Sequence, residues 1–143
     1  MFDRCLYFNL NTLTRTVNKI WDQAFESFEL SPAHAYLLRL VLANPGLSQR
    51  AIALELGLEK STIARFTEAL QAKGMLKRKK KGREQLIYPS DAALEIADRL
   101  AAKGQALFET MTGSIGQQTV SSLVGELKKT NQILASLDRS DIP

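Results

Sequence analysis

Two short helical segments joined by a glycine-containing turn constrain the fold of this chain more than any other feature. Residues 49–56 form the first segment, with Ser48 as its N-cap and Gly57 where a left-handed C-cap is needed. The second segment covers residues 60–73 and ends before Gly74. Its apolar positions recur at helical spacing and are predicted to face the core: Ile63, Phe66 and Leu70. Two short helices joined by a glycine-containing turn are typical of a helix-turn-helix unit.

The sequence pattern changes directly after this unit. Residues 77–81 are a continuous basic run, Gly82 marks a turn, and residues 85–88 have strand character before Pro89. These features predict a β-hairpin in the position that the wing of a winged helix-turn-helix unit occupies.

Two helices are expected ahead of the unit. Residues 5–28 carry apolar side chains in alternating steps of three and four, which predicts a helix with one apolar stripe. Ser31 and Pro32 are typical of an N-cap and a first-turn proline, and they open a helix through residues 33–43. The turn-forming residues 44–46 (Asn-Pro-Gly) end it.

Two more helices are expected after the hairpin. Ser90 or Asp91 can cap a long amphipathic helix that residues 113–116 should break, and a last helix covers about 117–137. The terminal helices have apolar stripes that the small middle unit cannot cover. We therefore expect them to interlock with a second copy across the axis of a homodimer.

The predicted fold is mainly α with a small β-hairpin wing. A chain of 143 residues has room for one domain with one core, so 1–143 is expected to be a single domain. Within it, the winged helix-turn-helix unit covers about 31–90, and dimerisation helices cover 1–30 and 91–143.

Positive charge is concentrated in the predicted winged unit. From Ser48 to Arg83 there are ten Lys or Arg against three acidic residues, a balance of +7. The rest of the chain has nine basic and twelve acidic residues, so the net charge of +4 conceals a steep local gradient. Such a polarised molecule suits a polyphosphate partner such as double-stranded DNA.

The second helix of the unit carries the side chains best suited to reading bases. Lys60, Ser61 and Thr62 stand at its start, where small hydroxyl residues let a helix approach DNA closely. Arg65 has the reach and the forked donors to bind a guanine edge in the major groove. A Ser-Thr pair at a helix start is more often part of the cap, which is the alternative.

Phosphate contacts are expected from the preceding helix and from the wing. Ser48 and Gln49 can donate to phosphates together with the free amides of their helix. Arg83, beside the turn glycine, is the candidate for insertion into a minor groove. Three lysines would hold the DNA backbone beside it: Lys79, Lys80 and Lys81. A lysine run is more often a solvated loop, but its place after a helix-turn-helix pattern favours DNA contact.

Three segments of the sequence resemble the MarR family of bacterial regulators: LSQRAIA at 47–53, LEKSTIARF at 58–66 and LQAKGMLKR at 70–78. The resemblance extends over nearly the whole length. It implies a triangular homodimer that binds a pseudopalindromic operator, usually as a repressor released by a small ligand or by oxidation. Wings of the family often read Asp-x-Arg; here Arg83 matches the arginine, but Lys81 stands in place of the acid that braces it.

Cys5 resembles the reactive cysteine of the organic-hydroperoxide regulators in this family, which makes redox sensing an alternative. Those proteins activate the thiol with tyrosines, whereas this chain has Asn9 and Lys19 at the corresponding places. A small buried hydrophobic role is therefore favoured for Cys5. A single cysteine forms no intramolecular disulfide or zinc cluster, so a reducing cytoplasm is the expected compartment.

The resemblance also implies a ligand cleft between the dimer helices and the winged unit. Four residues could line it, although such aromatics more often belong to a core: Trp21, Phe25, Tyr36 and Arg39. His34 is the only histidine, and an ordinary polar role is expected for it rather than metal binding.

Other function classes lack their characteristic residues. No catalytic triad, phosphate-binding glycine loop or acid pair stands out, so we expect a non-enzyme without cofactor or metal. No apolar run suggests a membrane segment, and the first residues lack an export signal. A winged-helix module that binds protein instead of DNA remains an alternative; it would need an apolar recognition helix and a neutral wing.

Overall fold

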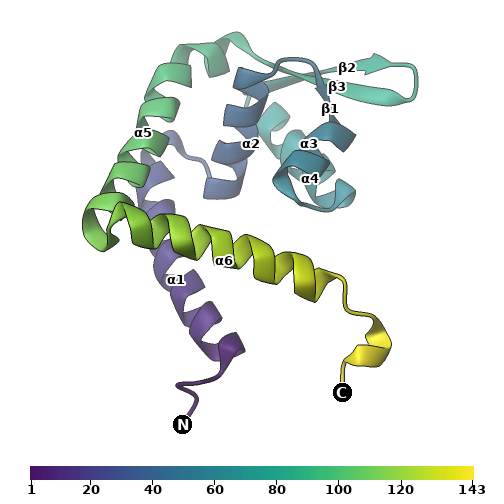
Figure 1. The fold of residues 1–143 in the computed structure, drawn as a ribbon. Helices are drawn as coiled ribbons and strands as arrows, with labels where there is room; N and C mark the ends of the chain where they lie inside the picture. The colour runs from purple at the N-terminus through teal and green to yellow at the C-terminus, as the bar shows by residue number, and fades with distance from the viewer. The chain divides into compact units, whose positions relative to one another are not determined.

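The computed structural model describes residues 1–143 and contains six α-helices and one small antiparallel sheet (Figure 1). It divides into two compact units, Met1–Gly104 and Gln105–Pro143. The elements in chain order are α1 (Leu6–Phe25), α2 (Pro32–Ala43), β1 (Leu47–Ser48), α3 (Gln49–Leu56), α4 (Lys60–Ala72), β2 (Leu76–Lys81), β3 (Glu84–Pro89), α5 (Asp91–Ile115) and α6 (Gln117–Ala135), with short 3-10 turns at Glu26–Phe28 and Arg139–Asp141. The mainly α fold with a hairpin wing is confirmed. No helix has both the length and the apolar character that crossing a bilayer requires.

Local capping explains why three helices begin where they do. In each case a serine hydroxyl oxygen accepts a hydrogen bond from the backbone N–H three residues later, at 3.1–3.2 Å. The capping residues are Ser31 for α2, Ser48 for α3 and Ser90 for α5. At the other end of α3, Gly57 adopts the left-handed conformation with φ 63°, as its position predicted.

Several helix ends differ from the sequence-based expectation. The first helix stops at Phe25, and the 3-10 turn that follows ends where Glu29 takes a left-handed conformation with φ 54°. Gly113 lies inside α5, and the break comes only at Gly116, where φ is 89°. A glycine with ordinary backbone angles costs a helix about 1 kcal/mol relative to alanine, which is too little to end a long one. The last helix ends at Ala135.

The sheet has a third strand that the sequence analysis missed. The strand order is β1-β3-β2, and β1 pairs antiparallel with β3 through Leu47 opposite Ile87 and Ser48 opposite Leu86. A strand of two residues shows no alternation that could be recognised in a sequence. Its effect is to fix the start of α3 to the base of the wing.

The core of the first unit lies among α2, α3, α4 and β3. Its fully buried members include Leu37, Leu38, Val41, Ile52, Ile63, Leu70 and Ile87. The expectation for Phe66 was wrong: the ring is only half-buried, at the rim, and meets His34 edge-on at 4.7 Å between centroids. Thr67 takes the core position instead, and its hydroxyl donates to the backbone oxygen of Ile63 at 2.6 Å. That bond satisfies the buried hydroxyl.

Both terminal regions keep large apolar side chains in contact with solvent. On α1 the exposed stripe includes Leu6, Leu10 and Leu13. Within the second unit, α6 exposes Leu123, Leu127 and Leu134. One copy of the chain thus leaves uncovered the stripes that the sequence assigned to dimerisation.

Candidate nucleic-acid interface

The outer face of α4 presents polar side chains. Lys60, Ser61 and Arg65 are exposed, while Thr62 is half-buried. The N-cap of the helix is Glu59, in an extended conformation and without a side-chain cap bond. Ser61 and Thr62 therefore lie within the first turn and do not cap it, so capping does not account for this pair.

The start of α3 offers a different kind of contact. The oxygen of Ser48 accepts from the N–H of Ala51 at 3.1 Å, and the hydroxyl hydrogen is left to donate to a further partner. Gln49 is half-buried in the first helical position. Free amide groups at a helix start attract anions, and a donating hydroxyl adds to that preference.

Four of the predicted contact residues lie around one hollow of about 260 Å³: Ser48, Gln49, Lys60 and Arg83. The hollow joins the starts of α3 and α4 to the tip of the wing. Sequence reasoning missed three further lining residues: Arg50, Glu84 and Gln85. Arg50 could have been found from its place in the first turn of α3, whereas the other two depend on the strand register.

Strand alternation divides the predicted wing lysines between two faces. In the β2–β3 ladder, Lys79 is opposite Leu86, Lys80 is opposite Gln85 and Lys81 is opposite Glu84. Because successive side chains alternate, Lys79 and Lys81 share one face and Lys80 lies on the other. The Lys79 ammonium is 5.1 Å from the centroid of the Tyr88 ring, a cation–π contact on the first face.

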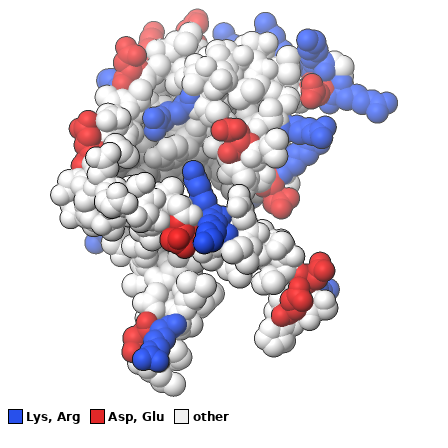
Figure 2. Space-filling view, viewed as in Figure 1, with Lys and Arg blue, Asp and Glu red and all other residues white.

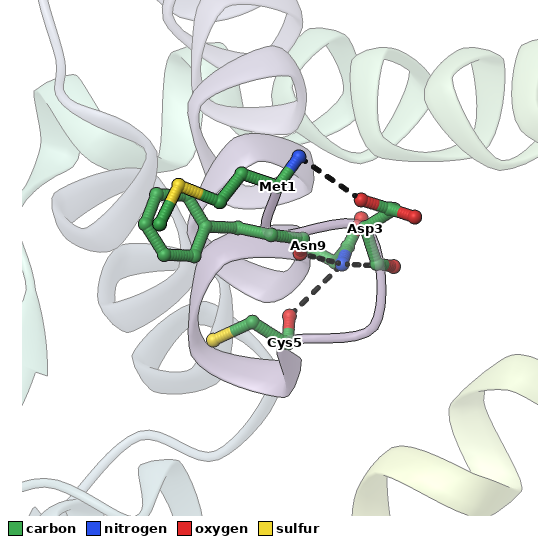
Figure 3. A network of polar contacts seen from close by, with 5 residues as sticks. Met1, Asp3, Cys5 and Asn9 are labelled. Atoms are coloured by element: carbon green, nitrogen blue, oxygen red, sulfur yellow. Dashed lines mark hydrogen bonds and ion pairs between the residues drawn. The ribbon is translucent and has the colours of Figure 1, made fainter.

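The basic side chains of this region have no carboxylate partners within the chain. The one ion pair joins the amino group of Met1 to Asp3 at 3.2 Å, in the N-terminal segment (Figure 3). Figure 2 shows Lys and Arg side chains projecting from the part of the surface that carries the wing. Glu84 is the one acidic residue that lines the hollow, so positive charge is in excess there. Such an excess attracts a polyanion, and the attraction weakens as salt is added.

The predicted ligand residues form a contiguous cluster between α1 and α2. The indole N–H of Trp21 donates to the Tyr36 hydroxyl at 3.1 Å, and the Arg39 guanidinium lies 5.4 Å from the Tyr36 ring centroid. Phe25 meets Tyr36 edge-on at 6.0 Å but is fully buried, so it is a core residue. Gly104 explains the position of Arg39, because any side chain on Gly104 would collide with the guanidinium.

His34 has a packing role that its sequence position did not reveal. It lies half-buried on α2 with its ring against Phe66 of α4. Burial, followed by the positive charge of Lys73, lowers the pKa of His34 below its ordinary value. The imidazole is therefore neutral near pH 7, as suits its contact with an aromatic ring.

Cys5 is half-buried and is the residue that precedes α1. One helical turn further on, the amide nitrogen of Asn9 donates to the backbone oxygens of Cys5 at 2.9 Å and Asp3 at 3.0 Å (Figure 3). The place where the hydroperoxide regulators have an activating phenol is thus occupied by an amide that holds the N-terminal turn. The packing role expected for Cys5 stays a prediction, and a redox role stays the alternative.

Comparisons with known proteins agree with this fold. Residues 28–84 match the model of the MarR family. Solved structures similar to this chain include a MarR protein from Peptoclostridium difficile, at 22% identity, covering 90% of this chain and 88% of that chain with a TM-score of 0.76. The MepR–DNA complex of S. aureus has 17% identity, coverage of 90% and 97% and a TM-score of 0.79. The PcaV regulator of Streptomyces coelicolor, solved with its natural ligand, has 21% identity, coverage of 84% and 89% and a TM-score of 0.72. No curated protein matches.

The fold and the basic surface define a winged helix-turn-helix protein. Its segment 28–84 matches the MarR family of transcriptional regulators.

Proposed function

We propose that this chain is a sequence-specific DNA-binding regulator that acts as a homodimer on a pseudopalindromic operator. The observation that carries the proposal is the hollow where Ser48, Gln49, Lys60 and Arg83 meet with no acidic partner in an ion pair. These groups come from three separate elements, and all of them can bind phosphates or base edges of DNA.

Each element has its own part in the proposed complex. α4 is the recognition helix, and Arg65 on its exposed face reads a base in the major groove. The start of α3 binds phosphate through Gln49 and the Ser48 hydroxyl. Arg83 at the wing tip enters the minor groove. The wing lysines bind phosphates of the two DNA strands beside that groove. Lys80 does so from one face of the wing, and Lys79 and Lys81 do so from the other.

The exposed apolar stripes support the dimer. Leucines on α1 and on α6 would otherwise remain in water. An isologous contact between two copies buries the same stripe twice, which is the usual arrangement of two-fold oligomers. The two recognition helices then meet successive half-sites of one duplex.

We further propose that the regulator is a repressor released by a small ligand. The PcaV structure contains a natural ligand, and this chain has Trp21, Tyr36 and Arg39 in one polar-aromatic cluster. Arg39 is half-buried and has no carboxylate partner. A ligand with an anionic group would pair with its guanidinium.

Selection of bound fragments from genomic DNA by the purified full chain tests the proposal. We expect a small set of fragments that share an imperfect palindrome. Equal recovery of all fragments, or recovery of none at low salt, would contradict it. A module that binds protein would need an apolar recognition helix, whereas α4 exposes Lys60, Ser61 and Arg65.

Replacing Arg83 by alanine is expected to weaken binding to a selected fragment and to reduce the slope of log affinity against log salt by about one. The reason is that one cation leaves the DNA interface. Anisotropy titrations of labelled duplex at several salt concentrations measure both quantities. Arg99→Ala is the matched control, because Arg99 is an exposed arginine of α5 outside the hollow. Identical slopes for the two variants would remove Arg83 from the interface.

A further inference from the structure

The recognition helix and the wing must be held at a fixed angle if they are to enter two grooves of one duplex. This requirement rests on the proposed DNA-binding function. Backbone bonds close the junction between the two elements: Gly74 N–H donates to the oxygen of Gln71 and Met75 N–H to that of Leu70, both at 2.9 Å. These bonds set the turn, and the β1–β3 pairing holds the base of the hairpin. The direction of the hairpin beyond its base is left to side chains.

A single hydrogen bond between side chains links α4 directly to the wing. The Nε–H of Arg78, on β2, donates to Oε1 of Gln71, in the last turn of α4, at 2.5 Å. Arg78 is opposite Ile87 in the β-ladder, and the Ile87 side chain is fully buried. Because opposed residues on neighbouring strands share a face, the Arg78 stem lies on the inner side of the sheet.

Arg78 differs in this respect from the other cations of the basic run. Lys79 stacks on Tyr88, whereas Lys77, Lys80 and Lys81 make no hydrogen bond or ion pair within the chain. Among these cations, only Arg78 donates a hydrogen bond to a side chain of the recognition helix. Its Nε donor is specific to arginine, because a lysine ammonium has no planar fork to match it.

We propose that Arg78 is a positioning residue for DNA recognition: its bond to Gln71 fixes the angle between the recognition helix and the wing, and phosphate binding is left to the other cations. Gln71 provides the acceptor of this bond and is a positioning residue for the same reason. Neither residue was among the contact residues expected from the sequence. Losing the bond lets the wing tip drift in the free protein, so binding must first restore the angle at which Arg83 and Arg65 reach their grooves together.

The test uses the full chain and a duplex selected as above, titrated at several salt concentrations. Gln71→Ala removes the acceptor without changing charge, and Arg78→Lys keeps the charge without the Nε donor. We expect each to weaken binding about fivefold, the size of a typical coupling between contacting residues, with a salt slope equal to that of the wild type. The double variant should be no weaker than either single one.

Lys77→Ala is the matched control, because it removes the neighbouring cation from the opposite face of β2 and leaves the Gln71 bond intact. Its effect should add to that of Gln71→Ala. Footprints of the saturated Gln71→Ala complex should keep both the major-groove protection and the minor-groove protection of the wing, because the same cations contact DNA once the wing is ordered. Both substituted positions are exposed, and thermal unfolding curves should stay those of the wild type.

Wild-type affinity for Gln71→Ala or for Arg78→Lys would overturn the inference, since charge alone would then suffice. Arg78→Ala could instead reduce the salt slope by about one while Gln71→Ala binds with wild-type affinity. Arg78 would then be an ordinary phosphate contact, and the inference would fail. These results leave the proposed function standing, because they require a wild-type protein that binds DNA. Failure of the wild type to bind any selected duplex overturns both.

Discussion

Arg65→Ala is expected to lose about 1–3 kcal/mol of binding free energy on the preferred DNA sequence and much less on an unrelated one. Arg65 lies on the exposed face of α4. Ile63, two residues earlier, is fully buried and holds the opposite face of the helix against the core. A guanidinium on the exposed face can present two donors to a guanine edge. The loss should therefore depend on sequence, unlike the loss of a phosphate contact.

Competition titrations with the selected duplex and a scrambled duplex measure the difference. Arg65→Lys is the informative companion, because it keeps the charge but cannot form the bidentate pair. We expect it to recover the affinity for the scrambled duplex and little of the preference. Equal losses on both duplexes would show that Arg65 binds phosphate and reads no base.

Ile63→Ala is expected to lower the free energy of unfolding by about 2–5 kcal/mol. The side chain is 0% exposed, so truncation leaves a cavity between α4 and the rest of the core. Urea unfolding followed by circular dichroism measures the loss, at one protein concentration because dimer formation contributes to stability.

Leu54→Ala provides the control for that experiment. Leu54 is also an aliphatic residue of the helix-turn-helix unit, on α3, but its side chain is 85% exposed. We expect its removal to change stability by no more than about 0.5 kcal/mol. Similar losses for the two variants would mean that the packing of α3 and α4 differs from the one described.

Much of the fold could be predicted from local chemistry. Ser31, Ser48 and Ser90 cap helices through bonds to amides three residues away, and Gly57 ends α3 with a positive φ. Such signals depend only on neighbours in the sequence, so a sequence contains them. The wing was predictable for a similar reason, since Gly82 separates two extended runs.

The parts that were missed depend on contacts between distant segments. Phe66 and Thr67 both fit an apolar helix face, and only the packing against α2 decides that the threonine is buried and the ring lies at the rim beside His34. The bond between Gln71 and Arg78 is a comparable case, because it depends on how the hairpin returns beside the helix. Strand register likewise determines which lysines share a face.

Hydroxyl-radical footprinting of a selected duplex with the wild-type chain tests the central claim most directly. The account predicts two protected half-sites related by two-fold symmetry, with major-groove contacts about one helical turn apart and minor-groove protection outside them. It also predicts that protection disappears steeply as salt rises. Protection of one half-site by a monomer, or no protection even at low salt, would contradict it.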